Sequence, residues 1–223
     1  MSTRATYQIN KTTFYCHYDG YPTGAAQRFA SMVAAMTVAV EGHRIIDERR
    51  GGFEYAFIRG VMDAEPTKNH DEHGDTEWRY TLNVAKDGSA AITVHEGKWK
   101  DQQDGGSWRT FSVAYHGDLA AWLNEQRGEL VKMLTNAKAK GYSDIKDPEA
   151  EALECIPVMV RVEEPFDYGT GHAVYATATE ATKIAKMLQA QSDGFSPDNP
   201  NRNGYAKRTA AWRAAVEPEL QPA

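Results

Sequence analysis

Residues 14–24 read Phe-Tyr-Cys-His-Tyr-Asp-Gly-Tyr-Pro-Thr-Gly, and this stretch decides how the chain begins to fold. An alternating polar and apolar segment ends at Asp19-Gly20, and Pro22 fixes the backbone just before an alanine-rich run. Residues Arg4–Ile9 alternate in the same way, which is typical of a second strand. We therefore expect an N-terminal β-hairpin, followed by a turn in which Gly20 takes a positive φ.

A helix is expected directly after this turn. Thr23 is a candidate N-cap because its hydroxyl can accept a hydrogen bond from an unpaired amide of the first turn. The helix is predicted over residues Gly24–Val40, where apolar side chains recur every three or four positions. Gly42 is the expected stop.

Alternating segments dominate the next part of the chain. Residues Lys86–Gly88 form a hairpin-turn signal between two of these segments, so the strands should pair antiparallel. Trp99 lies outside the expected strands, in a polar loop beside two lysines. The strands predicted for the 53–115 meander are Phe53–Ile58, Glu77–Val84, Ala90–Val94 and Trp108–Tyr115, separated by loops at Ala64–Thr76 and Asp101–Gly106.

Helix signals return in the second half. Asp118 is a good N-cap for a long helix that should end at Gly141, and Thr177 with Glu180 matches a capping box. A strand is expected at Pro157–Val162. The composition of residues 194–204 is typical of a linker, and Tyr205–Val216 is amphipathic.

These patterns predict an α+β fold, with a mostly antiparallel sheet and two or three long helices packed on it. The expected organisation is one domain over residues 1–193, a linker over 194–204, and a C-terminal helix and tail over 205–223.

Composition narrows the class of protein. The chain has 223 residues, 41% of them hydrophobic, a net charge of −6 and a pI near 5.7. Direct nucleic-acid binding needs a basic footprint, so we do not expect it. No apolar run approaches membrane-spanning length, no secretory signal is expected, and two cysteines do not make a disulfide framework. A cytoplasmic location and no cofactor are predicted.

Two small constellations suggest chemistry. His17 and Asp19 are spaced to share one face of a strand, where they could act as an acid–base pair. With Tyr21 they adjoin the Gly20–Gly24 helix start, which could instead bind a small anion or nucleotide. Turn formation alone also explains Asp19, and that interpretation is favoured.

His70 and His73, in an acidic segment, could ligate the metal of a hydrolase. The segment does not read as a helix and lacks a third ligand at an established spacing, so a solvated loop and no metal are favoured. Cys16 is expected to be a small buried hydrophobe rather than a nucleophile. The Gly169–Gly171 pair is expected to form a tight turn, because a phosphate cradle would need a third glycine.

Binding candidates are acidic or aromatic. Trp99 is flanked by lysines and is a candidate contact anchor. Two acidic groups could face a basic partner by charge complementarity. They are Asp71, Glu72, Asp75 and Glu77 in one segment, and Asp147, Glu149, Glu151 and Glu154 in another.

The N-terminal residues resemble those of a known group of proteins. Met1-Ser2-Thr3-Arg4-Ala5, followed by residues 15–22 (Tyr-Cys-His-Tyr-Asp-Gly-Tyr-Pro), is similar to the start of a loose group of small proteins from phages, plasmids and integrated bacterial elements. The resemblance covers about one eighth of the chain and carries no catalytic residues with it. It implies an accessory role, of which inhibition of host defence, as by anti-CRISPR proteins, is one example. The expected function is therefore anti-defence inhibition, of the anti-CRISPR type, by binding to a host protein or nucleoprotein complex that processes nucleic acid, without catalysis.

Overall fold

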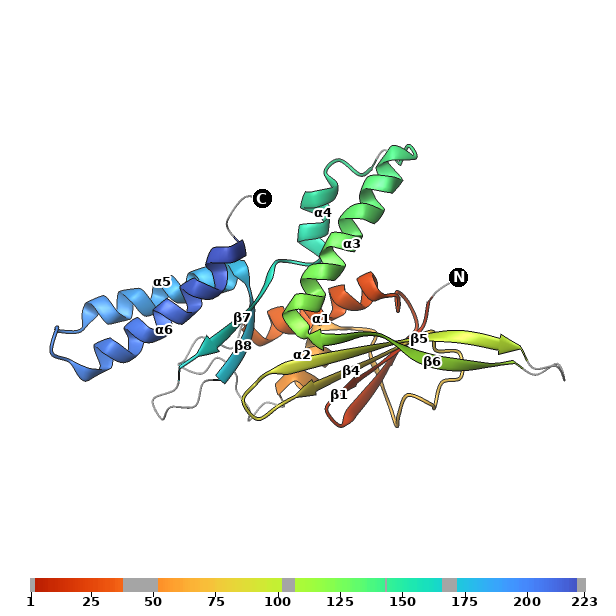
Figure 1. Cartoon of the computed structure of the whole chain (residues 1–223), viewed down its shortest axis with the longest axis horizontal. Coiled ribbons are helices and arrows are strands. Elements are labelled where there is room, and N and C mark those ends of the chain that lie inside the picture. Colours follow the sequence, from red (N-terminus) through yellow and green to blue (C-terminus); the bar gives the residue numbers. More distant parts are fainter. Residues whose placement is uncertain (1–2, 38–51, 102–106, 143, 166–171, 220–223) are drawn as a thin grey trace.

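The computed structural model describes residues 3–37, 52–101, 107–142, 144–165 and 172–219 (Figure 1). The predicted α+β class is confirmed. The strands are β1 Ala5–Ile9, β2 Thr12–Cys16, β3 Glu65–Thr67, β4 Trp78–Val84, β5 Ala90–Asp101, β6 Ser107–Asp118, β7 Met159–Glu164 and β8 His172–Thr177. The helices are α1 Pro22–Thr37, α2 Gly52–Gly60, α3 Leu119–Ala139, α4 Pro148–Cys155, α5 Ala178–Gly194 and α6 Pro200–Val216, with a short 3₁₀ helix at Glu217–Glu219.

Six strands form the main sheet in the order β3-β2-β1-β4-β5-β6. The predicted N-terminal hairpin and the predicted antiparallel run of β4, β5 and β6 are confirmed. β1 and β4 pair in parallel, which joins the hairpin to the meander across a long stretch of sequence. In this strand order, β3 and β6 are the two edges of the sheet.

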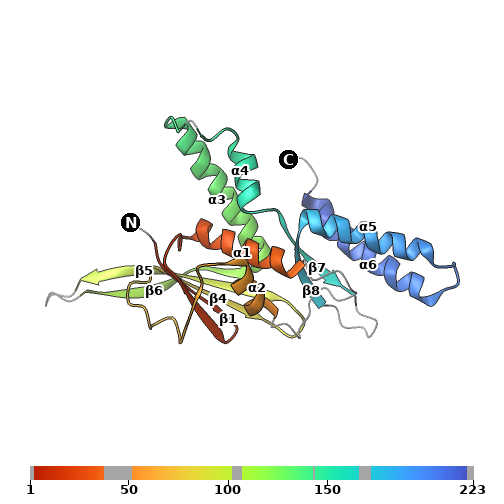
Figure 2. The ribbon, with the colours of Figure 1, turned by 180° about the vertical axis from the view of Figure 1, so that it is seen from behind.

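The two faces of the main sheet differ in chemistry. One face is buried under α1, α2 and α3 (Figure 2) and carries the fully buried side chains of Tyr7, Phe14 and Tyr80. Strand alternation sends the neighbouring residues to the opposite side, which we call the outer face. On β1 and β2 the outer-face residues Thr6, Gln8, Thr13 and Tyr15 are polar or amphipathic, as expected for a sheet that packs helices on one side only.

Residues 53–58 form a helix, so the predicted strand there is wrong. In α2 the side chains of Phe53, Ala56 and Phe57 are buried, a spacing of three and four residues that suits a helix face. Tyr55 and Ile58 are exposed. The aromatic residues at every second position also fitted the period of a strand. In the structure the segment is a helix, in which the Phe57 ring packs against the rings of Tyr7 and Phe29.

The turn after β2 also differs from expectation. The residue with positive φ is Asp19, at +51°, and Gly20 is not in that region. Gly20 is instead required by close packing, because a Cβ there would lie 2.7 Å from the Ala5 Cβ and 2.7 Å from the Arg4 carbonyl carbon. The Gly20 carbonyl accepts a hydrogen bond from the Tyr80 hydroxyl at 2.8 Å. Helix α1 starts at Pro22, so Thr23 lies inside its first turn rather than at the N-cap.

The caps predicted for the later helices are confirmed. Asp118 accepts hydrogen bonds from the Ala120 and Ala121 amides at the start of α3, and the Thr177 hydroxyl accepts one from the Glu180 amide. Gly141, with φ of +93°, follows the last turn of α3. The predicted helix stop at Gly42 lies outside the described residues.

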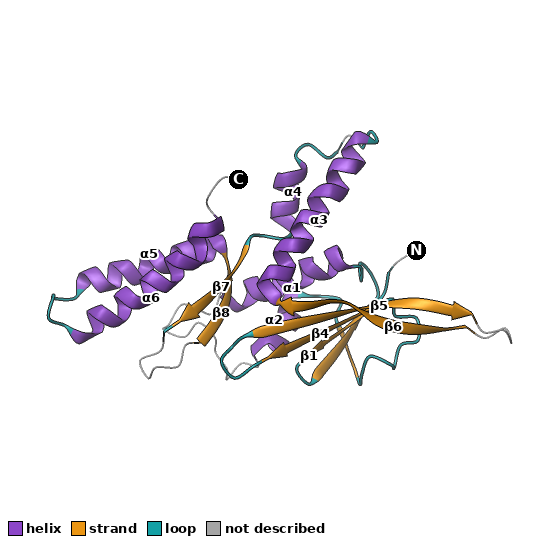
Figure 3. Ribbon diagram, in the orientation of Figure 1, coloured by secondary structure: helices purple, strands orange, loops and turns teal. Residues whose placement is uncertain are grey.

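A second, smaller cluster of buried residues lies between the β7–β8 hairpin and the α5–α6 pair (Figure 3). Trp212 of α6 is fully buried in it, and the almost fully buried Glu164 of β7 forms an ion pair with Arg208 of α6, whose side chain is 26% exposed. Helix α6 begins at Pro200 with Asn199 as its N-cap, so the last residues of the segment expected to be a linker are helical. The division into a domain, a linker and a C-terminal helix stays a prediction.

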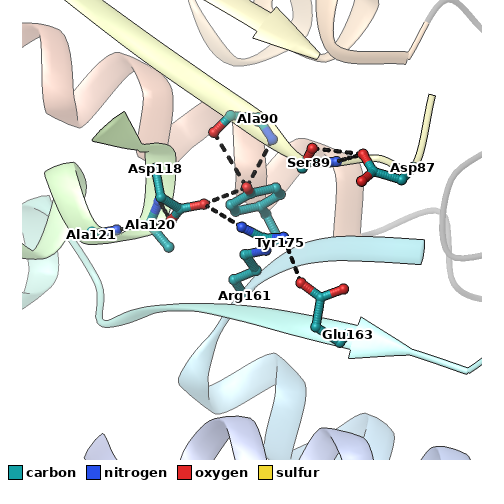
Figure 4. A network of polar contacts seen from close by, with 9 residues as sticks. All are labelled: Asp87, Ser89, Ala90, Asp118, Ala120, Ala121, Arg161, Glu163 and Tyr175. Carbon is teal, nitrogen blue, oxygen red and sulfur yellow. Dashed lines mark hydrogen bonds and ion pairs between the residues drawn. The ribbon is translucent and has the colours of Figure 1, made fainter. Parts of the chain in front are cut away.

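A polar network joins the two clusters (Figure 4). The Tyr175 hydroxyl on β8 donates to the Asp118 carboxylate at 2.6 Å and accepts from the Ala90 amide at 2.9 Å. Arg161 on β7 lies 3.4 Å from the same carboxylate and 2.6 Å from Glu163. Burial, followed by the Asp118 carboxylate, raises the pKa of Tyr175 well above its usual value, so the hydroxyl stays a donor. Asp118 therefore caps α3 with one oxygen and ties β8 to the sheet with the other.

Among the described residues, no helix combines the length and apolar character needed to cross a membrane.

Candidate functional site

The outer face of the main sheet holds the largest concentration of the residues singled out in the sequence. Two observations define it: residues 68–77 form a loop that lies over β1, β2 and β4, and the β5–β6 hairpin extends beyond the last residue that pairs with β4. Trp78 of β4 pairs with Glu96, and the Gly97 amide donates to the Glu77 carbonyl, so residues 97–101 and 107–111 form an arm that, beyond Gly97, pairs with no described strand on the β4 side (Figure 1). We refer to these two parts as the 68–77 loop and the β5–β6 arm.

His70 anchors the loop to the sheet. Its two ring nitrogens lie 2.7 Å from the Thr6 hydroxyl on β1 and 3.2 Å from the Thr81 hydroxyl on β4. Burial is the main cause that lowers the pKa of His70 to about 4, and the Arg79 and His95 charges lower it further. The imidazole is therefore neutral at pH 7 and acts as a hydrogen-bonding bridge between two strands.

His73 and Asp75 hold the other end of the loop. The His73 ring stacks on the Tyr15 ring with centroids 3.8 Å apart. The Asp75 carboxylate lies 2.8 Å from the Arg4 guanidinium and accepts a hydrogen bond from the Tyr15 hydroxyl at 3.2 Å. Burial, followed by the Asp75 charge, raises the pKa of Tyr15 to about 12. The Tyr15 hydroxyl therefore stays protonated and keeps donating to Asp75.

Four side chains form an aromatic–arginine cluster beside the loop. The Arg109 guanidinium carbon lies 4.4 Å from the Trp99 ring centroid, and that of Arg79 lies 3.6 Å from the Phe111 ring centroid. Trp99 is 56% exposed. It belongs to β5, where it pairs with Arg109 of β6, so its placement in a loop is corrected. The cluster of Arg79, Trp99, Arg109 and Phe111 thus places an exposed indole on the arm, held by a cation.

Gly97 makes room for this cluster. A Cβ at Gly97 would lie 2.9 Å from the Phe111 ring and 3.1 Å from the Arg109 Cδ. A side chain at this position would displace both groups. The glycine therefore permits the close packing of the two residues across the arm.

Three of the four acidic residues of the loop have a cationic partner nearby. Asp71 pairs with Arg79 at 2.6 Å, and Asp75 pairs with Arg4. Glu72 lies 3.8 Å from the Lys68 amine and accepts a hydrogen bond from the Lys68 amide at 2.7 Å, which, with the Thr67 hydroxyl, lowers its pKa. Glu77 is half-buried, and its carbonyl accepts from the Gly97 amide. Asp71, Glu72 and Asp75 are exposed, but each has a cation close by, and their role as a contact surface stays a prediction.

The second acidic group belongs to α4, which packs beside α3 away from the outer face (Figure 1). Asp147 is the N-cap of α4, and Glu151 accepts a hydrogen bond from the Lys146 amide. Glu149 and Glu154 are exposed, and in the described part of the chain no ion pair involves them. These two carboxylates are the more accessible acidic candidates.

The structure does not bring His17 and Asp19 together as an acid–base pair. β2 ends at Cys16, so the expected strand spacing does not reach Asp19. His17 lies 3.4 Å from Glu65 of β3, whereas Asp19 is exposed in the turn. Tyr21 is half-buried, and burial followed by the Asp19 charge raises its pKa.

The helix start also has little room for an anion. A Cβ at Gly24 would lie 2.2 Å from the Asp19 carbonyl oxygen, so the chain's own backbone packs against the first turn of α1. An anion at the orphan amides of this turn would compete with that packing.

Metal and thiol chemistry have weak geometric support. His70 and His73 have separate partners, and no group of three or more metal-ligating side chains is found in the described ranges. Cys16 is fully buried, as expected, and burial raises the pKa of its thiol to about 12. The Gly169–Gly171 turn lies outside the described residues.

No protein-family model, curated protein or solved structure was found to match this chain. Arg79, Arg109 and Phe111 were not singled out in the sequence. Arg109 and Phe111 alternate with small polar residues, a pattern that indicates that both side chains lie on one face of a strand. The pattern does not show which residues lie opposite them, because that depends on the register of β5 with β6.

Proposed function

We propose that this chain acts by binding another protein, and that the β5–β6 arm with its aromatic–arginine cluster is the contact surface. The observation that carries the proposal is Trp99, which is 56% exposed on a projecting hairpin and stacked against Arg109. Tryptophan and arginine are the residue types most enriched at the energetic centres of protein interfaces. A side chain already held by a neighbour also loses less conformational entropy on binding.

A protein partner is favoured over nucleic acid by the local charge. The cations Arg4 and Arg79 are paired with Asp75 and Asp71, and Arg109 donates to the Asp75 carbonyl at 3.0 Å. A surface whose cations are already engaged by carboxylates or carbonyl groups offers little attraction to a phosphate backbone. The net charge of −6 points the same way.

The narrower proposal is that the partner is a host complex that processes nucleic acid and that binding inhibits it. Its support is the resemblance of residues 1–5 and 15–22 to proteins of mobile elements. The exposed carboxylates Glu149 and Glu154 on α4 could add a contact with a basic groove.

Affinity capture from bacterial lysate tests the proposal. The wild-type chain is compared with Trp99→Ala and with Tyr142→Ala, which removes a 65% exposed aromatic residue after the end of α3. We expect a protein that the wild type and Tyr142→Ala retain and that Trp99→Ala loses. Equal retention by Trp99→Ala would place the contact elsewhere on the molecule.

A further inference from the structure

Asp75 is the residue at which the 68–77 loop meets both the N-terminal hairpin and the β5–β6 arm. Its carboxylate lies 2.8 Å from the Arg4 guanidinium and accepts a hydrogen bond from the Tyr15 hydroxyl at 3.2 Å. Its carbonyl accepts a hydrogen bond from Arg109 of β6 at 3.0 Å. The side chain of Asp75 is therefore held at the hairpin, whereas its backbone holds a residue of the arm.

Arg109 has little else to fix its guanidinium. In the described part of the chain, the Asp75 carbonyl is the only hydrogen-bond acceptor found for Arg109, whose Nε is buried without a partner. Beyond Gly97 the arm pairs with no described strand on the β4 side, so the rest of the sheet does not brace it there. An arginine side chain has many rotamers, and a single well-placed acceptor selects among them. Asp75 therefore determines where the guanidinium lies.

The Arg109 guanidinium in turn holds Trp99. Its central carbon lies 4.4 Å from the centroid of the indole ring. Trp99 and Arg109 are directly opposite each other on β5 and β6, so the cation and the ring meet on one face of the arm. Because Trp99 is exposed, a stacked cation is an important restraint on its rotamer. A continuous chain of contacts thus runs from the hairpin through Asp75 and Arg109 to the indole.

We propose that Asp75 is a positioning residue for Trp99, which acts through Arg109 to hold the indole in the orientation that binds the partner. The consequence for binding rests on the proposed function, whereas the order of the Trp99 side chain in the free protein does not. This role differs from the direct acidic contact expected of Asp75 from the sequence. A carboxylate that only met the partner would leave the free Trp99 side chain unchanged.

Nuclear magnetic resonance of the Trp99 indole tests the chain of contacts without any partner. The resonance is assigned by its loss in Trp99→Phe, and the heteronuclear nuclear Overhauser effect (NOE) of the indole N–H reports motion on the ps–ns timescale. The variants are Asp75→Ala, Arg109→Ala and their combination, with Asp87→Ala as a matched control. Asp87 is also an aspartate whose carboxylate and carbonyl both accept hydrogen bonds, but it lies beyond the opposite end of β5.

We expect the NOE of Trp99 to fall in Asp75→Ala and in Arg109→Ala, and to keep the wild-type value in Asp87→Ala. The combined variant should have the same NOE as Arg109→Ala alone, because Asp75 acts on the indole through that arginine. A wild-type NOE in either Asp75→Ala or Arg109→Ala would overturn the proposal, and so would a further fall in the combined variant.

Thermal unfolding and the resonances of the other indoles check that each variant folds. The double variant Arg4→Gln/Tyr15→Phe removes both groups that hold the Asp75 carboxylate and leaves Asp75 itself in place. It replaces Asp75→Ala if that variant does not fold, and the same fall in the NOE is expected.

The affinity for the captured partner separates this inference from the proposed function. Asp75→Ala should weaken binding by about three- to tenfold, the range expected when one or two side chains must be ordered on binding. In a double-mutant cycle its effect should not add to that of Arg109→Ala, and full additivity would show that Asp75 contacts the partner directly. Wild-type binding by Trp99→Ala would contradict the proposed function and leave the NOE result in the free protein standing.

Discussion

The histidine that bridges β1 and β4 should make folding stability depend on pH. His70 is half-buried, its pKa is lowered to about 4, and both ring nitrogens are hydrogen-bonded to threonine hydroxyls. The unfolded chain takes up a proton on this residue near its ordinary value of about 6.5, whereas the folded chain does so only near pH 4. Its contribution to stability is therefore complete above pH 6.5 and is lost as the pH falls toward 4.

The size of the effect follows from the two pKa values. A difference of about 2.5 between 6.5 and 4 corresponds to an upper bound of about 3.4 kcal/mol. Because water reaches part of the ring, screening reduces this bound, and we expect about 1–2 kcal/mol.

Urea unfolding followed by tryptophan fluorescence measures this effect. The wild type and His70→Gln are compared at pH 7.5 and pH 4.5, so that other titrating groups cancel in the difference between the two proteins. The wild type should lose about 1–2 kcal/mol more than the variant on acidification. Equal losses in the two proteins would refute the claim that His70 is held neutral between the strands.

Three further predictions concern the fold. Gly20→Val should lower the free energy of unfolding by about 1–3 kcal/mol or more, because the new side chain meets backbone atoms of β1, and a thermal melt unchanged by the substitution would contradict it. Glu164→Ala should cost about 1–3 kcal/mol by leaving the partly exposed Arg208 without its carboxylate, as measured by denaturant unfolding; a loss below about 1 kcal/mol would show that water replaces the pair. In the native protein at pH 8 a thiol reagent should modify the exposed Cys155 and spare Cys16, and modification of both without unfolding would mean that Cys16 is accessible.

Local signals in the sequence predicted much of the fold. The hairpin of β1 and β2, the Asp118 and Thr177 caps and the β4–β5 turn each depend on a few neighbouring residues, and all are confirmed. The strand predicted at 53–58 failed because a short aromatic segment fitted both periods, and only packing against other elements selects the helix. The parallel β1–β4 pair has no local signal, since its strands are far apart in the chain.

The candidate site was less predictable. The sequence singled out Trp99 and the acidic residues of the 68–77 loop as binding candidates, which stays a prediction, but it could not show that Asp71 and Asp75 are paired with Arg79 and Arg4. Those pairings arise from the sheet order, which brings distant strands together. The loop therefore packs against the outer face of the sheet, and its role as an acidic contact surface stays a prediction.

The most direct test of the account is the affinity of the captured partner for two variants of the purified chain. One is Trp99→Ala on the β5–β6 arm, and the other reverses the exposed carboxylates Glu149 and Glu154 on α4 to lysine. If the arm is the contact surface, Trp99→Ala should weaken binding by about thirtyfold, as expected of an interface hot spot, while the α4 variant changes affinity by only a few fold. Full affinity of Trp99→Ala together with loss of binding by the α4 variant would contradict the account.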